Sequence, residues 1–171
     1  MGVSTITISY RFTGPMSKRF KIERFVDPAF VTLLYDLLKD FNERVGSMST
    51  PEDMLRYIAK ALFVGAPMRV YVVFDGKENR IVGLAVLLVG DFPPRLWVEI
   101  FHIKKEYAKY GLAKKLWKKI YEDMQKEGVK ELFCTVKDTA RARLFRKAGF
   151  KPAEIVLRCE VKGECVQGGR K

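Results

Sequence analysis

Residues that build metal and redox sites are scarce in this sequence. Its 171 residues include one histidine and three cysteines. Cys134, Cys159 and Cys165 show no C-x-x-C or other metal-ligand spacing, and the lone His102 leaves no His/Cys cluster. We therefore expect no metal site in this protein.

Long apolar runs are absent too. The longest one, Ile81 to Val89, is far shorter than the ~20 residues that a membrane-spanning helix needs. The segment from Met1 to Tyr10 also lacks the basic start and apolar core of a secretory signal. We therefore expect a cytoplasmic protein with reduced thiols and no membrane partner.

Acidic residues are outnumbered by basic ones, 20 against 32, which gives a net charge of +12. This excess favours polyanionic partners such as phosphate-bearing cofactors, nucleic acid or acidic proteins, and it does not choose among them. With 48% hydrophobic residues, a chain of this length can form one compact domain that buries roughly two-thirds of its unfolded surface. We predict one domain over residues 1–161 and a flexible tail over 162–171.

Helical periodicity predicts four helices. The first follows Asp27 and Pro28, an N-cap and first-turn pair, and carries apolar residues at helical spacing as far as Phe41. A second begins at Thr50, with Asp53 in the capping-box position. The third runs over residues 112–126 and the fourth over 140–147. One apolar stripe marks the third helix: Leu112, Leu116, Ile120 and Met124.

Alternating and β-branched segments predict the strands. Residues 5–12 alternate apolar and polar side chains, and residues 20–25 are a candidate continuation of this edge. Further strands are predicted at residues 70–74, 81–89, 96–103, 131–136 and 153–161. Short turns at Asp75-Gly76 and Pro93-Pro94 indicate an antiparallel meander for the first three of these. Together with the helices, this order indicates the α/β class.

The segment from Trp97 to Lys119 is the most informative for function. A strand leads through a short loop to Gly111, which opens an amphipathic helix. A helix N-terminus offers unpaired backbone N–H groups and partial positive charge, so such a loop suits a phosphate group. A solvated basic helix is the alternative interpretation, and the spacing alone leaves both open. Five lysines crowd this end of the helix: Lys104, Lys105, Lys109, Lys114 and Lys115.

Two motifs resemble those of the GNAT acetyltransferase family. The segment from Ile103 to Ala113, I-K-K-E-Y-A-K-Y-G-L-A, is similar to the family's V-x-P-x-Y-[RQ]-x-x-G-x-[GA] motif between a strand and a helix. The segment from Asp138 to Phe150, D-T-A-R-A-R-L-F-R-K-A-G-F, resembles the family's N-x-x-A-x-x-L-Y-x-x-x-G-F. The order of elements agrees over nearly the whole chain. The resemblance implies a GNAT-like α/β fold of the α+β type, a mixed, mostly antiparallel central sheet with helices on both faces.

The resemblance implies acetyl-CoA as the cofactor. The backbone of Phe101, His102 and Ile103 would pair with the pantetheine arm. Asp138 stands where the family has an asparagine that contacts pantetheine, Phe145 stands where it has a tyrosine, and we include both in the predicted site. The predicted pyrophosphate cradle comprises Lys109, Tyr110, Gly111, Leu112, Ala113 and Lys114.

The resemblance also implies the reaction. An acetyl group would pass from acetyl-CoA to a primary amine that attacks the thioester directly in a ternary complex. Glu99 lies on the strand where many members place a glutamate base, and we predict it as the base. Strand alternation would put its side chain on the same face as those of Trp97, Phe101 and Ile103. A strand glutamate that faces solvent or an arginine is the competing interpretation, and His102 is the other titratable group nearby.

Departures from the family pattern support a competing hypothesis. Ala108 replaces the family's Arg or Gln, and Phe145 cannot donate a proton as the tyrosine does. Either Tyr107, Tyr110 or water would replace the tyrosine, or the acid is dispensable because a thiolate is a fair leaving group. If catalysis has been lost, a GNAT-fold module would use its basic face to hold nucleic acid or another polyanion. A homodimer formed by strand pairing of the C-terminal hairpin is a third hypothesis. The sequence does not identify the acceptor, whether small molecule or protein.

Overall fold

The computed structural model describes residues 19–46, 49–90, 95–136 and 139–153. The chain divides into two compact units, Met1–Cys134 and Thr135–Lys171, and each is described by itself. The predicted strand over residues 5–12, almost all of the one over 153–161 and the predicted tail over 162–171 lie outside the described residues.

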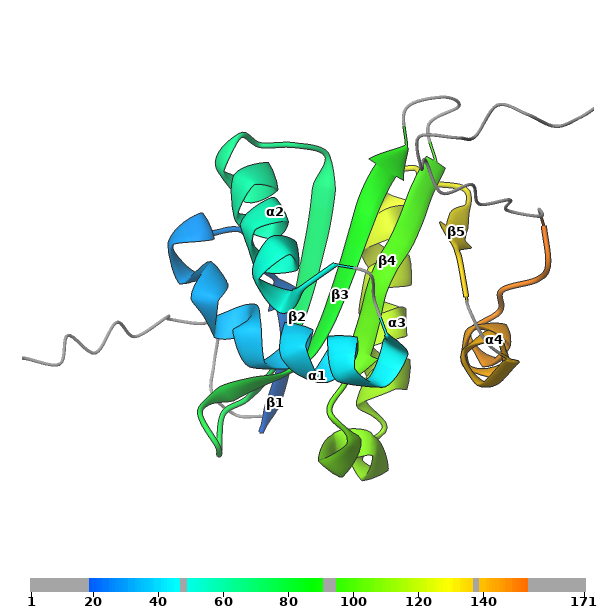
Figure 1. Cartoon of the computed structure of the whole chain (residues 1–171). Coiled ribbons are helices and arrows are strands. Elements are labelled where there is room, and N and C mark those ends of the chain that lie inside the picture. Colours follow the sequence, from blue (N-terminus) through cyan, green and yellow to red (C-terminus); the bar gives the residue numbers. More distant parts are fainter. Residues whose placement is uncertain (1–18, 47–48, 91–94, 137–138, 154–171) are drawn as a thin grey trace, which may run out of the picture. The chain divides into compact units, whose positions relative to one another are not determined.

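A five-stranded sheet forms the centre of the first unit. Its first four strands pair antiparallel, whereas the last pairs parallel with the fourth (Figure 1). This arrangement confirms the predicted mixed, mostly antiparallel sheet. In spatial order, which is also the chain order, the strands are β1 (Phe20–Arg24), β2 (Met68–Asp75), β3 (Arg80–Gly90), β4 (Arg95–Ile103) and β5 (Leu132–Cys134).

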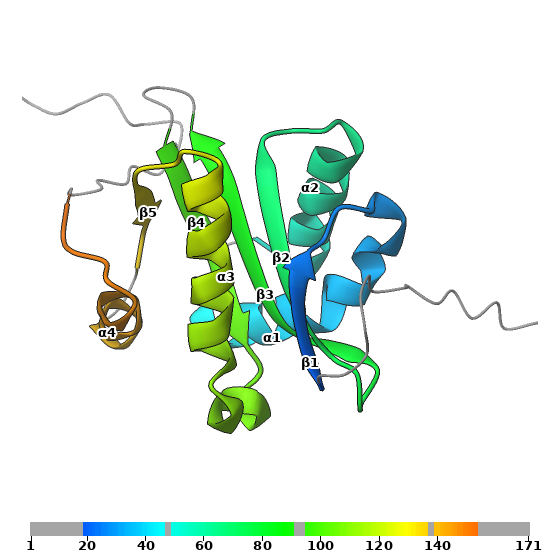
Figure 2. The same ribbon diagram turned by 180° about the vertical axis from the view of Figure 1, so that it is seen from behind.

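Helices cover both faces of this sheet, as predicted. The helices α1 (Tyr35–Val45) and α2 (Pro51–Phe63) lie on one face, and α3 (Leu112–Lys126) lies on the other (Figure 1 and Figure 2). Thr50 caps α2, since its hydroxyl accepts the backbone N–H of Asp53 at 3.1 Å. None of the described helices is long and apolar enough to cross a membrane. The predicted stripe of α3 is buried: Leu112, Leu116, Ile120 and Met124.

The helix predicted from Pro28 onward begins differently. Its first part is a 3₁₀ helix, η1 (Pro28–Leu34), and α-helical geometry starts only at Tyr35. Side chains three residues apart lie on the same side of a 3₁₀ helix, and the buried residues of η1 are Val31 and Leu34. Core packing at this three-residue spacing therefore replaces the 3.6-residue period that the sequence predicts for this segment.

The core between the sheet and the two helices α1 and α2 fixes which way the strand residues face. Every second residue of β2 from Met68 to Phe74 belongs to it, and so do Leu84 and Val86 of β3. Ala85 and Leu87 are buried as well, and they face the α3 side because successive side chains of a strand point to opposite faces. Cross-strand neighbours share a face, so the same pattern assigns the faces of β4.

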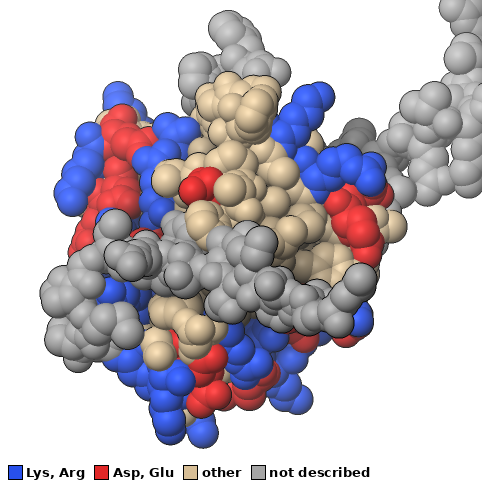
Figure 3. Space-filling model, turned by 90° about the vertical axis from the view of Figure 1, so that its left-hand side faces the viewer, with Lys and Arg blue, Asp and Glu red and all other residues tan. Residues whose placement is uncertain are grey.

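Charged side chains of both signs interleave on the surface that lies at the left of Figure 1. Figure 3 shows Lys and Arg beside Asp and Glu there, and a mostly uncharged region between them. Ion pairs also fasten α3 to the sheet, because Arg24 and Arg69 both reach Glu127, at 2.9 and 2.7 Å. Part of the positive charge is therefore matched within the described residues.

The second unit contains α4 (Thr139–Lys147) among its described residues. The ring of Phe145 is buried and meets the ring of Phe150 edge-on, with centroids 5.2 Å apart. Gly149 follows the helix with a φ of 95°, a left-handed conformation that suits glycine. The helix predicted over residues 140–147 is thus confirmed to within one residue.

We predict that Gly83→Ala destabilises the sheet. Gly83 pairs with Val73 on one side and Ile103 on the other. A Cβ atom here would come within 2.5 Å of Ile103 Cδ1 and 2.8 Å of Val73 Cγ2, and overpacking of this kind costs about 1–3 kcal/mol. Urea unfolding should show this loss in the free energy of unfolding. The exposed Lys118→Ala is the control and should stay within about 0.5 kcal/mol of wild type. Equal stability of Gly83→Ala and wild type would contradict the prediction.

Candidate cofactor site

Strand β4 carries one residue more than the part of β3 that lies opposite. Ile100 pairs with Val86 and Val98 pairs with Leu87, so Glu99 has no counterpart in β3. An extra residue of this kind is a β-bulge, which bends its strand and increases the local twist. Glu99 therefore stands at the bend of β4.

The other edge of β4 is paired with β5 over only three residues. Residues 96–98 pair with residues 132–134, and this pairing ends immediately before the bulge. Within the described part of the chain, no strand pairs with this edge from Glu99 to Ile103. An unpaired strand edge presents N–H and C=O groups that an extended ligand can bond. The predicted pantetheine contacts Phe101, His102 and Ile103 thus lie together on β4, beyond the last residue that pairs with β5.

The bulge overturns the predicted parity of Glu99. Simple alternation puts Glu99, Trp97 and Phe101 on one face of β4. In the structure Trp97 is opposite Leu88, which packs on the α1 and α2 side, whereas Phe101 stacks on Trp117 of α3 with ring centroids 4.2 Å apart. Trp97 and Phe101 therefore lie on opposite faces, because the extra residue between them shifts the alternation.

The carboxyl group of Glu99 has a raised pKa. Its cause is desolvation by the surrounding protein, which disfavours the charged form. The side chain is nevertheless exposed enough to be reached by a ligand. An accessible carboxylate whose pKa lies above the ordinary ~4.3 is a better proton acceptor near neutral pH.

His102 turns its side chain toward α1. Its ring Nε2 lies 2.6 Å from Oδ2 of Asp40, and the ring stands edge-on to Phe41 with centroids 5.7 Å apart. Arg44 Nε reaches the other carboxylate oxygen of Asp40 at 3.2 Å. Because the imidazole is held in the α1 layer, the predicted contact of His102 with a cofactor concerns its backbone.

The turn before α3 gathers the other predicted residues. Strand β4 leads into a 3₁₀ helix, η2 (Lys105–Tyr110), and Gly111 then reverses the chain with a φ of 64°, a conformation that suits glycine. Lys109 and Lys114 are exposed, whereas the side chain of Leu112 is buried. Leu112 can therefore offer a ligand only its backbone N–H.

The start of α3 is suited to an anion. The N–H groups of the first turn of a helix have no partner inside the helix, and the macrodipole adds partial positive charge. The first turn of α3 contains no acidic residue. Exposed lysines surround it, namely Lys105, Lys109, Lys114 and Lys115. A diphosphate at this point would meet backbone donors and cations together.

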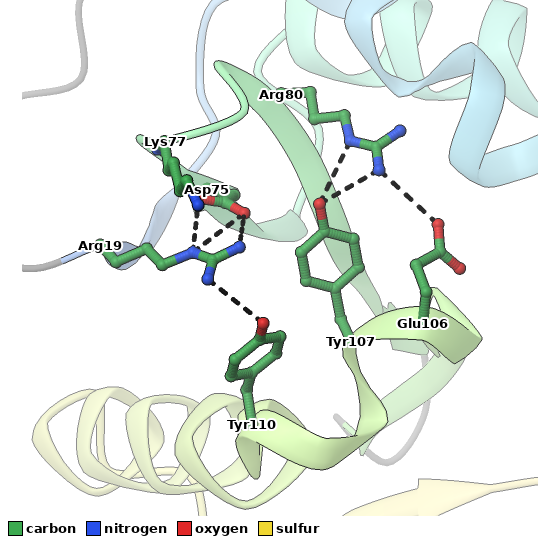
Figure 4. A network of polar contacts seen from close by, with 7 residues as sticks. All are labelled: Arg19, Asp75, Lys77, Arg80, Glu106, Tyr107 and Tyr110. Carbon is green, nitrogen blue, oxygen red and sulfur yellow. Dashed lines mark hydrogen bonds and ion pairs between the residues drawn. The ribbon is translucent and has the colours of Figure 1, made fainter.

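Sequence reasoning missed a group of side chains that holds η2 in place. Figure 4 shows that Arg19 donates hydrogen bonds to Asp75 and Tyr110 and that Arg80 donates to Tyr107. Asp75 is fully buried, and the guanidinium of Arg19 holds the pKa of its carboxyl group below the usual range. An aspartate before a glycine is typical of a turn, and no spacing signal links Asp75 to Arg19, 56 positions away.

Two predicted residues are not placed relative to β4. Asp138 lies outside the described residues, and Phe145 belongs to the second unit. Among the residues that the structure describes, no group of three His, Cys, Asp or Glu side chains could hold a metal ion.

Comparison with known proteins gives a family and a set of similar folds. Residues 31–150, more than half of the chain, match the model of the Acetyltransferase (GNAT) family. No curated protein sequence matches the chain.

Solved structures with a similar fold include several acetyltransferases. A predicted acetyltransferase with acetyl-CoA from Clostridium acetobutylicum is 14% identical, with a TM-score of 0.69 over 83% of this chain and 96% of that one. An aminoglycoside acetyltransferase from an uncultured soil metagenomic sample, in complex with trehalose, is 19% identical, with a TM-score of 0.67 over 86% and 99%. AAC(6')-Iy in complex with a bisubstrate analogue, CoA-S-monomethyl-acetylneamine, is 14% identical, with a TM-score of 0.67 over 85% and 99%. These likenesses show the fold alone. The match of the family model over residues 31–150 establishes that this chain belongs to the GNAT acetyltransferase family.

Proposed function

We propose that this protein transfers an acetyl group from acetyl-CoA to a primary amine, which attacks the thioester directly in a ternary complex. One observation carries the proposal. Strand β4 loses its β5 partner at the bulge of Glu99, no other described strand pairs with this edge beyond it, and β4 leads along the chain to the start of α3. A donor that has an extended amide-containing arm and a diphosphate fits an open strand edge followed by a helix N-terminus. Acetyl-CoA has this form.

The proposed site uses backbone groups for most of its contacts with the donor. Residues 101–103 would bond the amides of the pantetheine arm, and residues 109–114 with their lysines would hold the pyrophosphate. Two of the similar solved structures support this donor, since one contains acetyl-CoA and the other a bisubstrate analogue of CoA. Asp138 and Phe145 remain part of the proposal.

Glu99 is the proposed base. When the amine nitrogen bonds to the carbonyl carbon of the thioester, Glu99 takes the proton that the nitrogen releases. Backbone N–H groups of β4 beside the bulge stabilise the negative oxygen of the tetrahedral intermediate. The carbon–sulfur bond then breaks, the electron pair leaves with the sulfur as a thiolate, and the amide remains.

We assign no tyrosine as the acid that protonates this thiolate. Phe145 has no hydroxyl group, and the hydroxyls of Tyr107 and Tyr110 accept hydrogen bonds from Arg80 and Arg19. A thiol has a pKa of about 8.5, so the thiolate is a fair leaving group. Water can supply the proton after the bond has broken.

The charged side chains of α3 do not favour the alternative function, a module that binds nucleic acid or another polyanion. On α3, Lys118 and Lys119 lie 3.8 and 2.8 Å from Glu122 and Asp123, one turn further along. The helix therefore presents carboxylates among its lysines, which weakens its attraction for a phosphate backbone.

Acetyl-CoA should bind the native protein and stabilise it. A ligand present at 100 times its Kd adds about 2.7 kcal/mol to the free energy of unfolding, so the melting temperature should rise and then saturate, in high as well as low salt. ATP carries phosphates without a pantetheine arm and is the control, with a smaller shift that salt removes. Equal shifts for the two ligands, both abolished by salt, would support the polyanion-binding module instead.

Glu99→Gln should lower kcat about 10²- to 10⁴-fold, the usual contribution of a general base, and leave the Kd of acetyl-CoA unchanged. Because the pKa of Glu99 is raised, kcat/KM of the wild type should rise with pH through a value above the ordinary ~4.3. The variant should lack this dependence. Release of the CoA thiol, measured with a panel of primary amines over a range of pH, gives kcat and kcat/KM.

Glu131→Gln is the matched control, because Glu131 is exposed and lies just before β5. It should retain the kcat of the wild type. If Glu99→Gln also retains kcat, or loses kcat and affinity for acetyl-CoA in the same proportion, Glu99 is not the base.

A further inference from the structure

Arg19 connects the edge of the sheet to η2. Its Nε donates to Asp75 Oδ1 and Oδ2 at 3.1 and 3.3 Å, and its Nη2 donates to Oδ2 at 2.9 Å. Its Nη1 donates to the hydroxyl of Tyr110 at 3.2 Å (Figure 4). The backbone N–H of Lys77 gives Asp75 Oδ1 a further hydrogen bond of 2.9 Å. The guanidinium is therefore fixed by a buried carboxylate and presents a donor to η2.

Arg80 makes the second connection. Its Nε and Nη2 donate to the hydroxyl of Tyr107 at 3.3 and 3.1 Å, and Nη2 also lies 3.7 Å from Glu106 Oε1. Arg80 is the first residue of β3 and is exposed, whereas Tyr107 is buried. Both tyrosines of η2 thus receive a hydrogen bond from an arginine on the strand ends.

The rings of these residues pack together as well. Phe20 of β1 lies 4.9 Å from Tyr110 and 6.1 Å from Tyr107, and the two tyrosine rings are 6.0 Å apart, measured between centroids. Arg19 lies over the rings of Phe20 and Tyr110, 4.8 Å from each centroid. Hydrogen bonds and cation–π contacts therefore act on the same two tyrosines.

The backbone hydrogen bonds of η2 add to these side-chain contacts, and the N–H of Lys104, just before η2, donates to Val82 O at 3.0 Å. The backbone hydrogen bonds of η2 include Tyr107 N to Lys104 O at 2.9 Å and Gly111 N to Ala108 O at 3.4 Å, and the hydrogen bonds of a 3₁₀ helix have poorer geometry than those of an α-helix. The far end of α3 has its own anchor, Glu127 with Arg24 and Arg69. Loss of the tyrosine contacts should therefore disturb the turn before α3 more than α3 itself.

We propose that Arg19 and Arg80 are positioning residues for the diphosphate of the donor. Through Tyr110 and Tyr107 they hold η2 and Gly111 in the conformation that presents the backbone N–H groups of residues 112–114, the first turn of α3. Neither arginine needs to touch a phosphate for this role. The inference rests on the proposed function, because the diphosphate belongs to acetyl-CoA.

Binding of two donors to conservative variants tests this role. Tyr107→Phe keeps the ring and both arginine charges but removes the oxygen that accepts from Arg80. We expect the Kd of acetyl-CoA to rise about 10-fold, as for loss of one hydrogen bond to a charged group. The Kd of S-acetylpantetheine, which lacks the diphosphate, should not change. Titration calorimetry measures both constants, and Tyr57→Phe, an exposed tyrosine of α2, should alter neither.

A double-mutant cycle separates positioning from direct contact. Arg80→Gln changes an exposed residue and removes the same hydrogen bond from the other side, so it should reproduce the effect of Tyr107→Phe. The double variant should then be no weaker than either single one. Additive losses would mean that Arg80 acts on the phosphate by its own charge, and would overturn the inference.

Two further outcomes distinguish the inference from the function on which it rests. If the wild type binds acetyl-CoA and the variants bind both donors as it does, or lose both equally, the inference fails and the proposed function stands. If the wild type binds neither donor, the proposed function fails and the inference fails with it.

Discussion

The extra residue of β4 is the constraint on which the candidate site depends. On one side β4 is tied to β3 along its length, with Glu99 as the only residue between the paired Val98 and Ile100. On the other side the short parallel strand β5 stops at Val98. The bulge bends β4 where its pairing with β5 ends, and the proposed contacts with the donor follow directly after this bend. Beyond this bend, Gly83 of β3 lies between Val73 of β2 and Ile103 of β4. The side chains of these two residues leave no room for a Cβ atom at position 83.

Helix α3 is held near each end by arginines that lie in the strands or, for Arg19, immediately before β1. At its C-terminal end Glu127 accepts from Arg24 and Arg69, and at its N-terminal end the preceding η2 accepts from Arg19 and Arg80. Between them a buried stripe packs on the sheet, and Trp117 stacks on Phe101 with an interplanar angle of 8°. This packing fixes the helix N-terminus relative to the part of β4 that follows the bulge. A preformed arrangement of this kind lowers the cost of ordering groups when a ligand binds.

Features set by a few neighbouring residues could be predicted from the sequence. The cap at Thr50 and the apolar stripe of α3 are of this kind, because the chemistry that produces them lies within one or two helical turns. The faces of β4 on which the side chains around Glu99 lie could not be predicted, since a bulge arises from the pairing of two strands and leaves no local signal. The pairing of Arg19 with Asp75 joins residues 56 positions apart. The 3₁₀ geometry of η1 likewise depends on the core that receives Val31 and Leu34. The resemblance to a family predicted which residues form the candidate site, whereas long-range packing determines how these residues are arranged.

Among the described residues, the distribution of positive charge supports the proposed donor with its diphosphate over the alternative of an extended polyanion. Several arginines of the first unit pair with carboxylates: Arg19 with Asp75, Arg24 and Arg69 with Glu127, Arg44 with Asp40, and Arg56 with Asp53. Charges matched in this way contribute little to the field felt by a distant polyanion. Exposed lysines gather instead around the start of α3, where unpaired helical N–H groups add to their effect. Attraction at one helix end is what a diphosphate requires, whereas a nucleic acid strand needs cations along a continuous path.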